Sequence, residues 1–123
     1  IRLSVAMDIA KALEFLHKGH SGQTCFHRDV KSANVCLKKD YTALLIDCGV
    51  SKMTPSDDSK TTLTIMESAA YGLRGTPGYI CPVFARQMKG YSSANDIFSL
   101  GVVFAELFTG MLQNSKLNDE EVD

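Results

Sequence analysis

Two segments, one near each end of the chain, have the apolar spacing of helices. Between residues 1 and 17 the apolar side chains recur three or four positions apart, which predicts an amphipathic helix that ends at Gly19. Between residues 93 and 109 apolar side chains cover nearly every face, with Ser92 as the N-cap and Gly110 at the end. A helix that is apolar all round is a buried helix, so we expect this second helix to form the centre of the fold.

The region between the two helices predicts short strands and one long loop. A short apolar piece at residues 24–26 precedes a polar segment, and residues 35–37 and 43–46 then predict two strands joined by a turn. Residues 51–68 are rich in Ser, Thr, Asp and Lys and predict a long polar loop. Loops of this length inside a compact domain usually bind or regulate something.

Composition narrows the class of protein but names no partner. The 123 residues suffice for one domain or part of one, with 45% apolar residues, 22% charged residues and a net charge of -1. The scattered basic residues give no footprint for nucleic acid, and no apolar run is long enough to cross a bilayer. The four cysteines form no CxxC pair, so they are expected to be free thiols, which favours the cytoplasm or the cytoplasmic side of a membrane.

Four motifs occur in a fixed order along the chain. The first is His27-Arg28-Asp29-Val30-Lys31-Ser32-Ala33-Asn34, and Asp47-Cys48-Gly49 follows it after the two predicted strands. The third is the segment 75–82, with the sequence GTPGYICP, and the fourth is Asp96 with the helix that follows it. These motifs resemble the catalytic loop, the Asp-Phe-Gly motif, the substrate-side segment and the buried helix of eukaryotic-type protein kinases.

The resemblance implies an α+β fold, the protein-kinase-like fold, and it covers most of the chain. Residues 1–123 would be a partial kinase domain, namely a mainly α-helical C-terminal lobe with short β-strands around the catalytic loop. Its parts would be a first helix at 1–17, the catalytic loop at 27–34, the Asp-Phe-Gly-like motif at 47–49, the activation segment at 47–83 and the buried helix at 93–109. The family's N-terminal lobe and its last C-lobe helices would be absent. The closest pattern is that of the tyrosine-kinase-like group, which includes receptor-associated and receptor-like Ser/Thr kinases.

The resemblance also implies the site residues, the cofactors and the partners. Phosphoryl transfer needs positioning and neutralisation of charge more than covalent chemistry. Asp29 would accept or orient the proton of the substrate hydroxyl group, and Asn34 and Asp47 would hold Mg²⁺ on ATP. Lys31 and Thr76 match the pair that Ser/Thr-directed kinases place beside the transferred phosphate. The partners would be ATP and a protein substrate, and Asp96 would hold the backbone of the catalytic loop.

A regulatory site is expected in the polar loop. In many relatives the arginine at the position of Arg28 pairs with a phosphorylated residue that lies after the Asp-Phe-Gly motif. The candidates here are Thr61, Thr62 and Thr64, in a stretch rich in hydroxyl groups. A polar run is also often only solvated chain, and both readings stay open.

Two departures from the family pattern leave other functions open. Cys48 replaces the aromatic residue of Asp-Phe-Gly, and Val83 replaces the glutamate of the Ala-Pro-Glu motif. Both motivate the alternative of a pseudokinase or scaffold that signals by binding proteins. A small-molecule phosphotransferase is a third reading, against which the segment 75–82 argues. Because the family's Gly-rich loop and strand lysine come earlier in the domain, the isolated chain is expected to be inactive.

Overall fold

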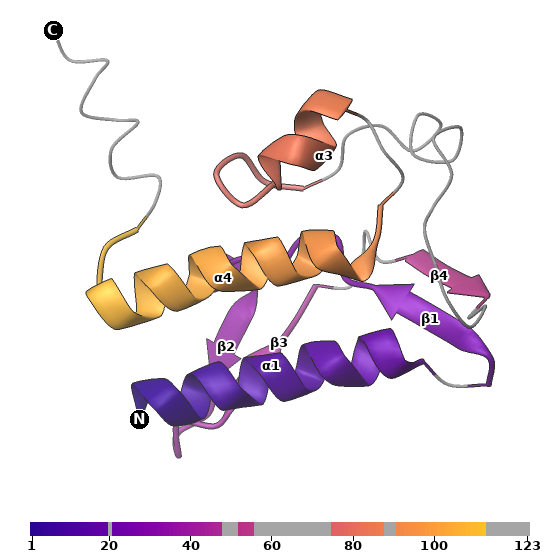
Figure 1. Ribbon diagram of the computed structural model, residues 1–123. Helices are drawn as coiled ribbons and strands as arrows, with labels where there is room; N and C mark the ends of the chain where they lie inside the picture. Colours follow the sequence, from indigo (N-terminus) through magenta and orange to yellow (C-terminus); the bar gives the residue numbers. More distant parts are fainter. Residues whose placement is uncertain (20, 48–51, 56–74, 88–90, 113–123) are drawn as a thin grey trace, which may run out of the picture.

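Two antiparallel helices form the body of the structure, a computed structural model that describes residues 1–19, 21–47, 52–55, 75–87 and 91–112. Helix α1 (Arg2–Lys18) and helix α4 (Ser93–Thr109) lie side by side and run in opposite directions (Figure 1). The guanidinium group of Arg2 accordingly donates to the carbonyl oxygen of Phe108 at 3.5 Å. The catalytic-loop motif therefore follows a helix that is packed against the helix of Asp96.

Two small antiparallel sheets complete the described fold. Strand β1 (Gln23–Phe26) pairs with β4 (Lys52–Pro55), and β2 (Val35–Leu37) pairs with β3 (Ala43–Leu45). The 3₁₀ turn η1 (Ser32–Asn34) lies directly before β2, and the short helix α3 (Pro82–Gln87) precedes α4. These elements confirm the mixed α+β fold with short strands around the motif 27–34.

The main core lies between α1, α4 and the β2–β3 hairpin. Its apolar members are all less than 9% exposed. They come from α1, α4, the catalytic-loop motif, β3 and the segment 75–82: Val5, Ile9, Leu13, Val30, Ala43, Tyr79, Leu100 and Val103. A second, aromatic cluster of Phe26, Phe84 and Tyr91 lies where β1 meets α3. The periodicity predicted for the first helix is therefore the periodicity of its buried face.

Glycine ends α1 for a steric reason. Gly19 has φ +71°, and a β-carbon at this position would lie 1.9 Å from the carbonyl oxygen of Gln23. Only glycine combines this backbone conformation with such a close approach, so the chain can turn from α1 directly into β1. Gly110 ends α4 in the left-handed conformation, and its N–H group donates to the carbonyl oxygen of Glu106 at 2.8 Å.

Three sequence-based expectations need correction. Helix α4 is not buried all round, because Ile97 and Phe108 are more than half exposed and its buried face is largely polar. Residues 52–55, which we expected to be part of a loop, form strand β4, since backbone pairing with β1 does not require apolar side chains. Helix α3 was not predicted, because its six residues are too few to show a period. Residues 56–74, with Thr61, Thr62 and Thr64, lie outside the described residues.

The first prediction concerns the core. Ile9 is 1% exposed, so Ile9→Ala should lower the free energy of unfolding by about 2–5 kcal/mol through lost burial and the cavity left behind. Met7 lies on the same helix and is 49% exposed, so Met7→Ala should change the free energy of unfolding by less than about 0.5 kcal/mol. Urea denaturation of both variants measures this, and equal losses would contradict the proposed core.

Candidate active site

The catalytic-loop motif is held by one buried carboxylate. Asp96, at the start of α4, has no exposed surface and accepts backbone hydrogen bonds from His27 at 2.9 Å and from Arg28 at 3.0 Å. Two side chains also donate to it, His17 from the last turn of α1 at 2.7 Å and Tyr91 from the segment before α4. Each carboxylate oxygen thus has one backbone partner and one side-chain partner.

Burial and hydrogen bonding act on this carboxyl group in opposite directions. Burial alone would raise the pKa of Asp96, because it disfavours the charged form. The hydrogen bonds from His17, Tyr91 and the two backbone N–H groups favour the charged form, and together they hold the pKa below its usual value. The group is therefore a carboxylate under ordinary conditions, and it can accept four hydrogen bonds.

The His27 side chain also fixes the conformation of the catalytic loop, through hydrogen bonds at both of its ring nitrogens. It is fully buried, and its Nδ1 atom accepts from the backbone N–H of Asp29 at 3.1 Å. Its Nε2 atom lies 2.9 Å from the carbonyl oxygen of Ile46, so the ring carries its proton on Nε2. The imidazole thus joins the loop to Ile46, the residue that precedes Asp47.

Four of the expected site residues lie together around Asp29. Its Oδ1 atom accepts from the Thr76 hydroxyl group at 2.8 Å, and that hydroxyl oxygen accepts from the Lys31 ammonium group, also at 2.8 Å. Its Oδ2 atom has only longer contacts, 3.5 Å to Lys31 Nζ and 3.4 Å to Asn34 Nδ2. The site therefore combines a carboxylate, an ammonium group, a hydroxyl group and an amide within a few ångströms.

A backbone hydrogen bond joins Asn34 to Ile46, the residue that precedes Asp47. The Asn34 amide nitrogen donates to the carbonyl oxygen of Asp29 at 2.8 Å, which turns its amide oxygen to the other side. The N–H group of Ile46 donates to the carbonyl oxygen of Asn34 at 2.8 Å, so the end of β3 is fixed beside η1. Asp47 follows directly, with φ +62°, a conformation that is uncommon outside glycine.

The segment 75–82 packs onto the loop and onto α4. The Tyr79 hydroxyl group lies 3.1 Å from the Ser32 hydroxyl group, and the Ser99 hydroxyl group donates to the Tyr79 carbonyl oxygen at 2.6 Å. Burial and the neighbouring carboxylate of Glu106 raise the pKa of Tyr79, so its hydroxyl group stays protonated. The substrate-side segment is thus anchored at both its side chain and its backbone.

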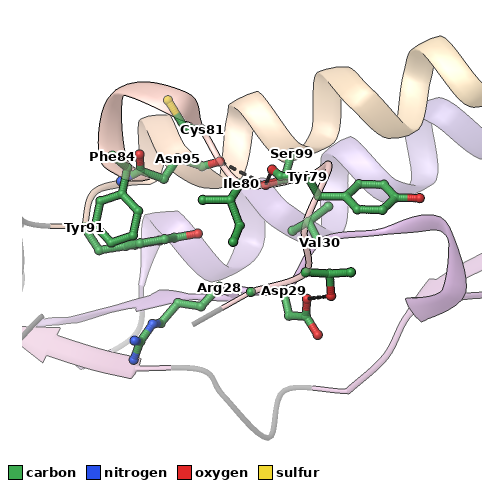
Figure 2. Close-up of a pocket in the computed structure, with 12 residues that line it drawn as sticks. Arg28, Asp29, Val30, Tyr79, Ile80, Cys81, Phe84, Tyr91, Asn95 and Ser99 are labelled. Atoms are coloured by element: carbon green, nitrogen blue, oxygen red, sulfur yellow. Dashed lines mark hydrogen bonds between the residues drawn. The ribbon is translucent and has the colours of Figure 1, made fainter. Parts of the chain in front are cut away.

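A small pocket lies between the catalytic loop, the segment 75–82 and the start of α4 (Figure 2). Its volume is about 10 Å³, room for about one water molecule. Arg28, Asp29 and Tyr91 are among the residues that line it. Within the described chain, no cluster of three or more His, Cys, Asp or Glu side chains has the arrangement of a metal site.

Some predicted residues are not brought into the site, and some contributing residues were missed. Val83 is 55% exposed on α3, while Cys48, Thr61, Thr62 and Thr64 lie outside the described residues. Sequence reasoning missed His17. It lies eight positions after Ile9 and therefore on the apolar face of α1, and a polar residue on that face was the signal that could have found it. Tyr91 had no comparable signal, because its partner depends on the tertiary fold.

The structure thus places a lysine, a threonine and an asparagine around Asp29, and comparison with known proteins identifies the family. A family model described as "Protein kinase domain" matches residues 2–122. The chain therefore belongs to the protein kinase family.

Proteins similar to this chain include receptor-like kinases of Arabidopsis thaliana. It is 37% identical over 121 residues to Wall-associated receptor kinase-like 17, covering 94% of this chain and 14% of the relative. It is 40% identical over 111 residues to Receptor-like serine/threonine-protein kinase NCRK, covering 89% and 19%. The chain thus spans less than a fifth of the length of these relatives. A helix long and apolar enough to cross a membrane does not occur among the described residues.

The second prediction concerns the buried carboxylate. Asp96→Asn should lower the free energy of unfolding at neutral pH by about 3–5 kcal/mol, the cost of breaking a buried charged network. The folded-state pKa of Asp96 lies below its unfolded value, so the stabilisation is present above the unfolded pKa and is lost as pH falls through the folded pKa. Denaturation midpoints between neutral and acid pH measure both effects.

The matched control for this prediction is Asp40→Asn. Asp40 is exposed, and its carboxylate accepts from the backbone N–H of Thr42 in a local turn, at 3.0 Å. The control should leave stability at neutral pH nearly unchanged. If Asp96→Asn and the control had the same midpoint, the network around Asp96 would not hold the fold.

Proposed function

We propose that this chain is the catalytic part of an active protein Ser/Thr kinase, which transfers phosphate from ATP to a hydroxyl group of a protein substrate with Mg²⁺ as cofactor. The observation that carries the proposal is the Asp29 cluster, in which Thr76 donates to one oxygen of the carboxylate and Lys31 and Asn34 both lie near the other. The family membership and the receptor-like relatives support the same chemistry. By that likeness, we also propose the cytoplasmic side of a membrane as the location.

The two oxygens of Asp29 differ in a way that suits this role. Oδ1 is engaged by Thr76 at 2.8 Å, whereas the contacts of Oδ2 are both 3.4 Å or longer. Oδ2 therefore keeps the capacity to accept a short hydrogen bond from an incoming hydroxyl group. We assign Oδ2 as the atom that orients the nucleophile and takes its proton.

Lys31 has two partners that it can exchange for phosphate oxygens. Its ammonium group donates to Thr76 at 2.8 Å and lies 3.5 Å from Asp29, and its side chain remains 24% exposed. An ammonium group is a compact charge on a flexible stem, suited to a transferred phosphoryl group. Thr76 keeps it close to the aspartate until substrate binds.

The residues fit a magnesium ion bound through ATP. Asn34 turns its amide oxygen away from its own hydrogen bond to Asp29, and Asp47 directly follows Ile46, whose backbone N–H group donates to the Asn34 carbonyl oxygen. Magnesium prefers hard oxygen ligands and usually takes one or two protein groups together with phosphate oxygens and water. When bound, it would neutralise charge on the phosphates, while Asn34 and Asp47 would fix its position relative to Asp29.

A pseudokinase that signals by binding is the alternative function. Val83 supports it, because a valine cannot form the ion pair that the family's glutamate makes at this position. The intact cluster around Asp29 supports the enzyme instead, since a binding module has no need for a carboxylate with an available oxygen. An activity assay separates the two.

The third prediction tests the enzyme directly. In the full-length protein, Asp29→Asn should lower kcat by about 10²–10⁴-fold, because the amide cannot take the proton of the substrate hydroxyl group. Asp47→Ala should abolish magnesium-dependent transfer. Phosphate transfer from ATP to a Ser/Thr peptide at fixed magnesium concentration measures both variants.

The control is again Asp40→Asn, which should keep the wild-type rate. Wild-type protein without transfer activity would favour the pseudokinase, and Asp29→Asn with more than a tenth of the wild-type rate would remove Asp29 from the mechanism. We expect the isolated 123 residues to transfer no phosphate, which the same assay checks.

The fourth prediction concerns regulation. If phosphorylation of the polar loop activates the enzyme, the variant with Thr61, Thr62 and Thr64 all replaced by alanine should have a strongly reduced rate after preincubation with ATP. Mass spectrometry of the wild type should find phosphate on at least one of the three. A triple variant with unchanged activity would leave the loop without this role.

A further inference from the structure

Tyr91 lies outside all four sequence motifs, yet it contacts the group that holds the catalytic loop. Its hydroxyl group donates to Asp96 Oδ1, the same oxygen that accepts the backbone N–H of Arg28 at 3.0 Å. The other oxygen, Oδ2, accepts from His17 and from the backbone of His27. Tyr91 therefore determines, together with one backbone group, how one half of the carboxylate is oriented.

The tyrosine ring is fixed by three neighbours from different elements. Tyr91 is 5% exposed, and its ring centroid lies 5.3 Å from that of Phe84 on α3 and 5.7 Å from that of Phe26 on β1. The Arg28 guanidinium carbon lies 5.7 Å from the same centroid. In Figure 2 the Tyr91 ring lies between Phe84 above and Arg28 below. Helix α3 and the catalytic loop therefore both contact the Tyr91 ring.

The backbone that this hydrogen bond supports is strained. Arg28 has φ +74°, a conformation that costs free energy for a residue with a side chain and that persists only where its surroundings enforce it. Asp96 accepts from the N–H group of Arg28, and Asp29 is the next residue. A small rotation of the Asp96 carboxylate would therefore move the backbone next to the reacting aspartate.

We propose that Tyr91 is a positioning residue for phosphate transfer, whose hydroxyl group orients the Asp96 carboxylate and thereby holds the Arg28–Asp29 backbone in its reactive conformation. The inference rests on the proposed kinase function. Burial, reinforced by the charge of Asp96, raises the pKa of the Tyr91 hydroxyl group, which therefore remains a donor throughout the working pH range. Tyr91 is thus a third support of the loop, beside Asp96 and His27.

The test compares Tyr91→Phe with Tyr41→Phe in the full-length kinase. Tyr91→Phe keeps the aromatic packing and removes only the hydroxyl group, and kcat should fall roughly 10-fold or more, as expected for losing a hydrogen bond to a charged group. The KM values for ATP and peptide should stay within about twofold, because Tyr91 lies outside the Asp29 cluster. Tyr41 is 52% exposed, and Tyr41→Phe should match the wild type.

A second measurement does not need activity. Amide hydrogen exchange of the peptide that covers residues 27–31 should be faster in Tyr91→Phe than in wild type, and unchanged in Tyr41→Phe. If wild-type protein transfers no phosphate, the proposed function fails, and the exchange rates alone decide whether Tyr91 positions the loop. Wild-type exchange rates in Tyr91→Phe would overturn the proposal.

Two further outcomes are decisive. A fall in kcat that only matches a loss of folded enzyme, determined by thermal unfolding and active-site titration, would make Tyr91 merely structural and would overturn the proposal. If Tyr91→Phe does not fold, Phe84→Leu replaces it, since this change loosens the support of the ring and keeps the hydroxyl group. Phe84→Leu should lower kcat and raise exchange at residues 27–31, and wild-type values for both would overturn the proposal.

Discussion

The hydrogen-bonded carboxylate of Asp96 is the interaction on which the rest of the structure depends. A buried charge is costly unless it is fully hydrogen bonded, and here four donors from three separate parts of the chain satisfy it. The end of α1, the catalytic loop and the segment before α4 cannot move independently without cost, because each movement would remove one or two of the four donors from a buried charge. Because all three elements donate to the same carboxylate, their positions relative to one another are fixed.

This constraint explains how strained backbone can persist beside the reacting groups. Arg28 and Asp47 both have positive φ angles, and each belongs to one of the first two sequence motifs. Asp96 holds Arg28 through its N–H group, while His27 joins the loop to the carbonyl oxygen of Ile46, next to Asp47. The strain is therefore offset by buried hydrogen bonds that fix the backbone on either side of Asp29 and before Asp47.

Much of the fold and of the site could be predicted from the sequence, for two different reasons. The apolar residues of helix α1 recur every three or four positions because they form the face that packs into the core. Gly19 ends the helix because a β-carbon would not fit there. The cluster around Asp29 could be named because its members lie in short motifs of fixed spacing. Thr76 is the exception, since it is 47 residues from Asp29 and only the resemblance to kinases connected the two.

The misses share a physical cause, namely that pairing over long sequence distances leaves no local pattern. Strand β4 pairs with β1 through backbone groups that every residue possesses, so its polar side chains suggested a loop. Helix α4 has apolar residues all round, but its buried face contains Asn95, Asp96, Ser99 and Glu106. An interpretation based on hydrophobicity alone therefore predicted a helix buried all round, whereas the structure buries one largely polar face.

The buried polar face of α4 also explains why this helix can serve as a scaffold for the site. Ser99 donates to the backbone of Tyr79, and Asp96 accepts from the backbone of the catalytic loop, so a single rigid helix contacts both the substrate-side segment and the reacting loop. One helical turn separates the two side chains, which fixes the distance between the two segments more firmly than loop-to-loop contacts would. Apolar contacts alone would tolerate sliding, whereas hydrogen bonds to backbone groups define a register. The polar residues of α4 therefore set the geometry of the site, and its apolar residues hold the helix in the core.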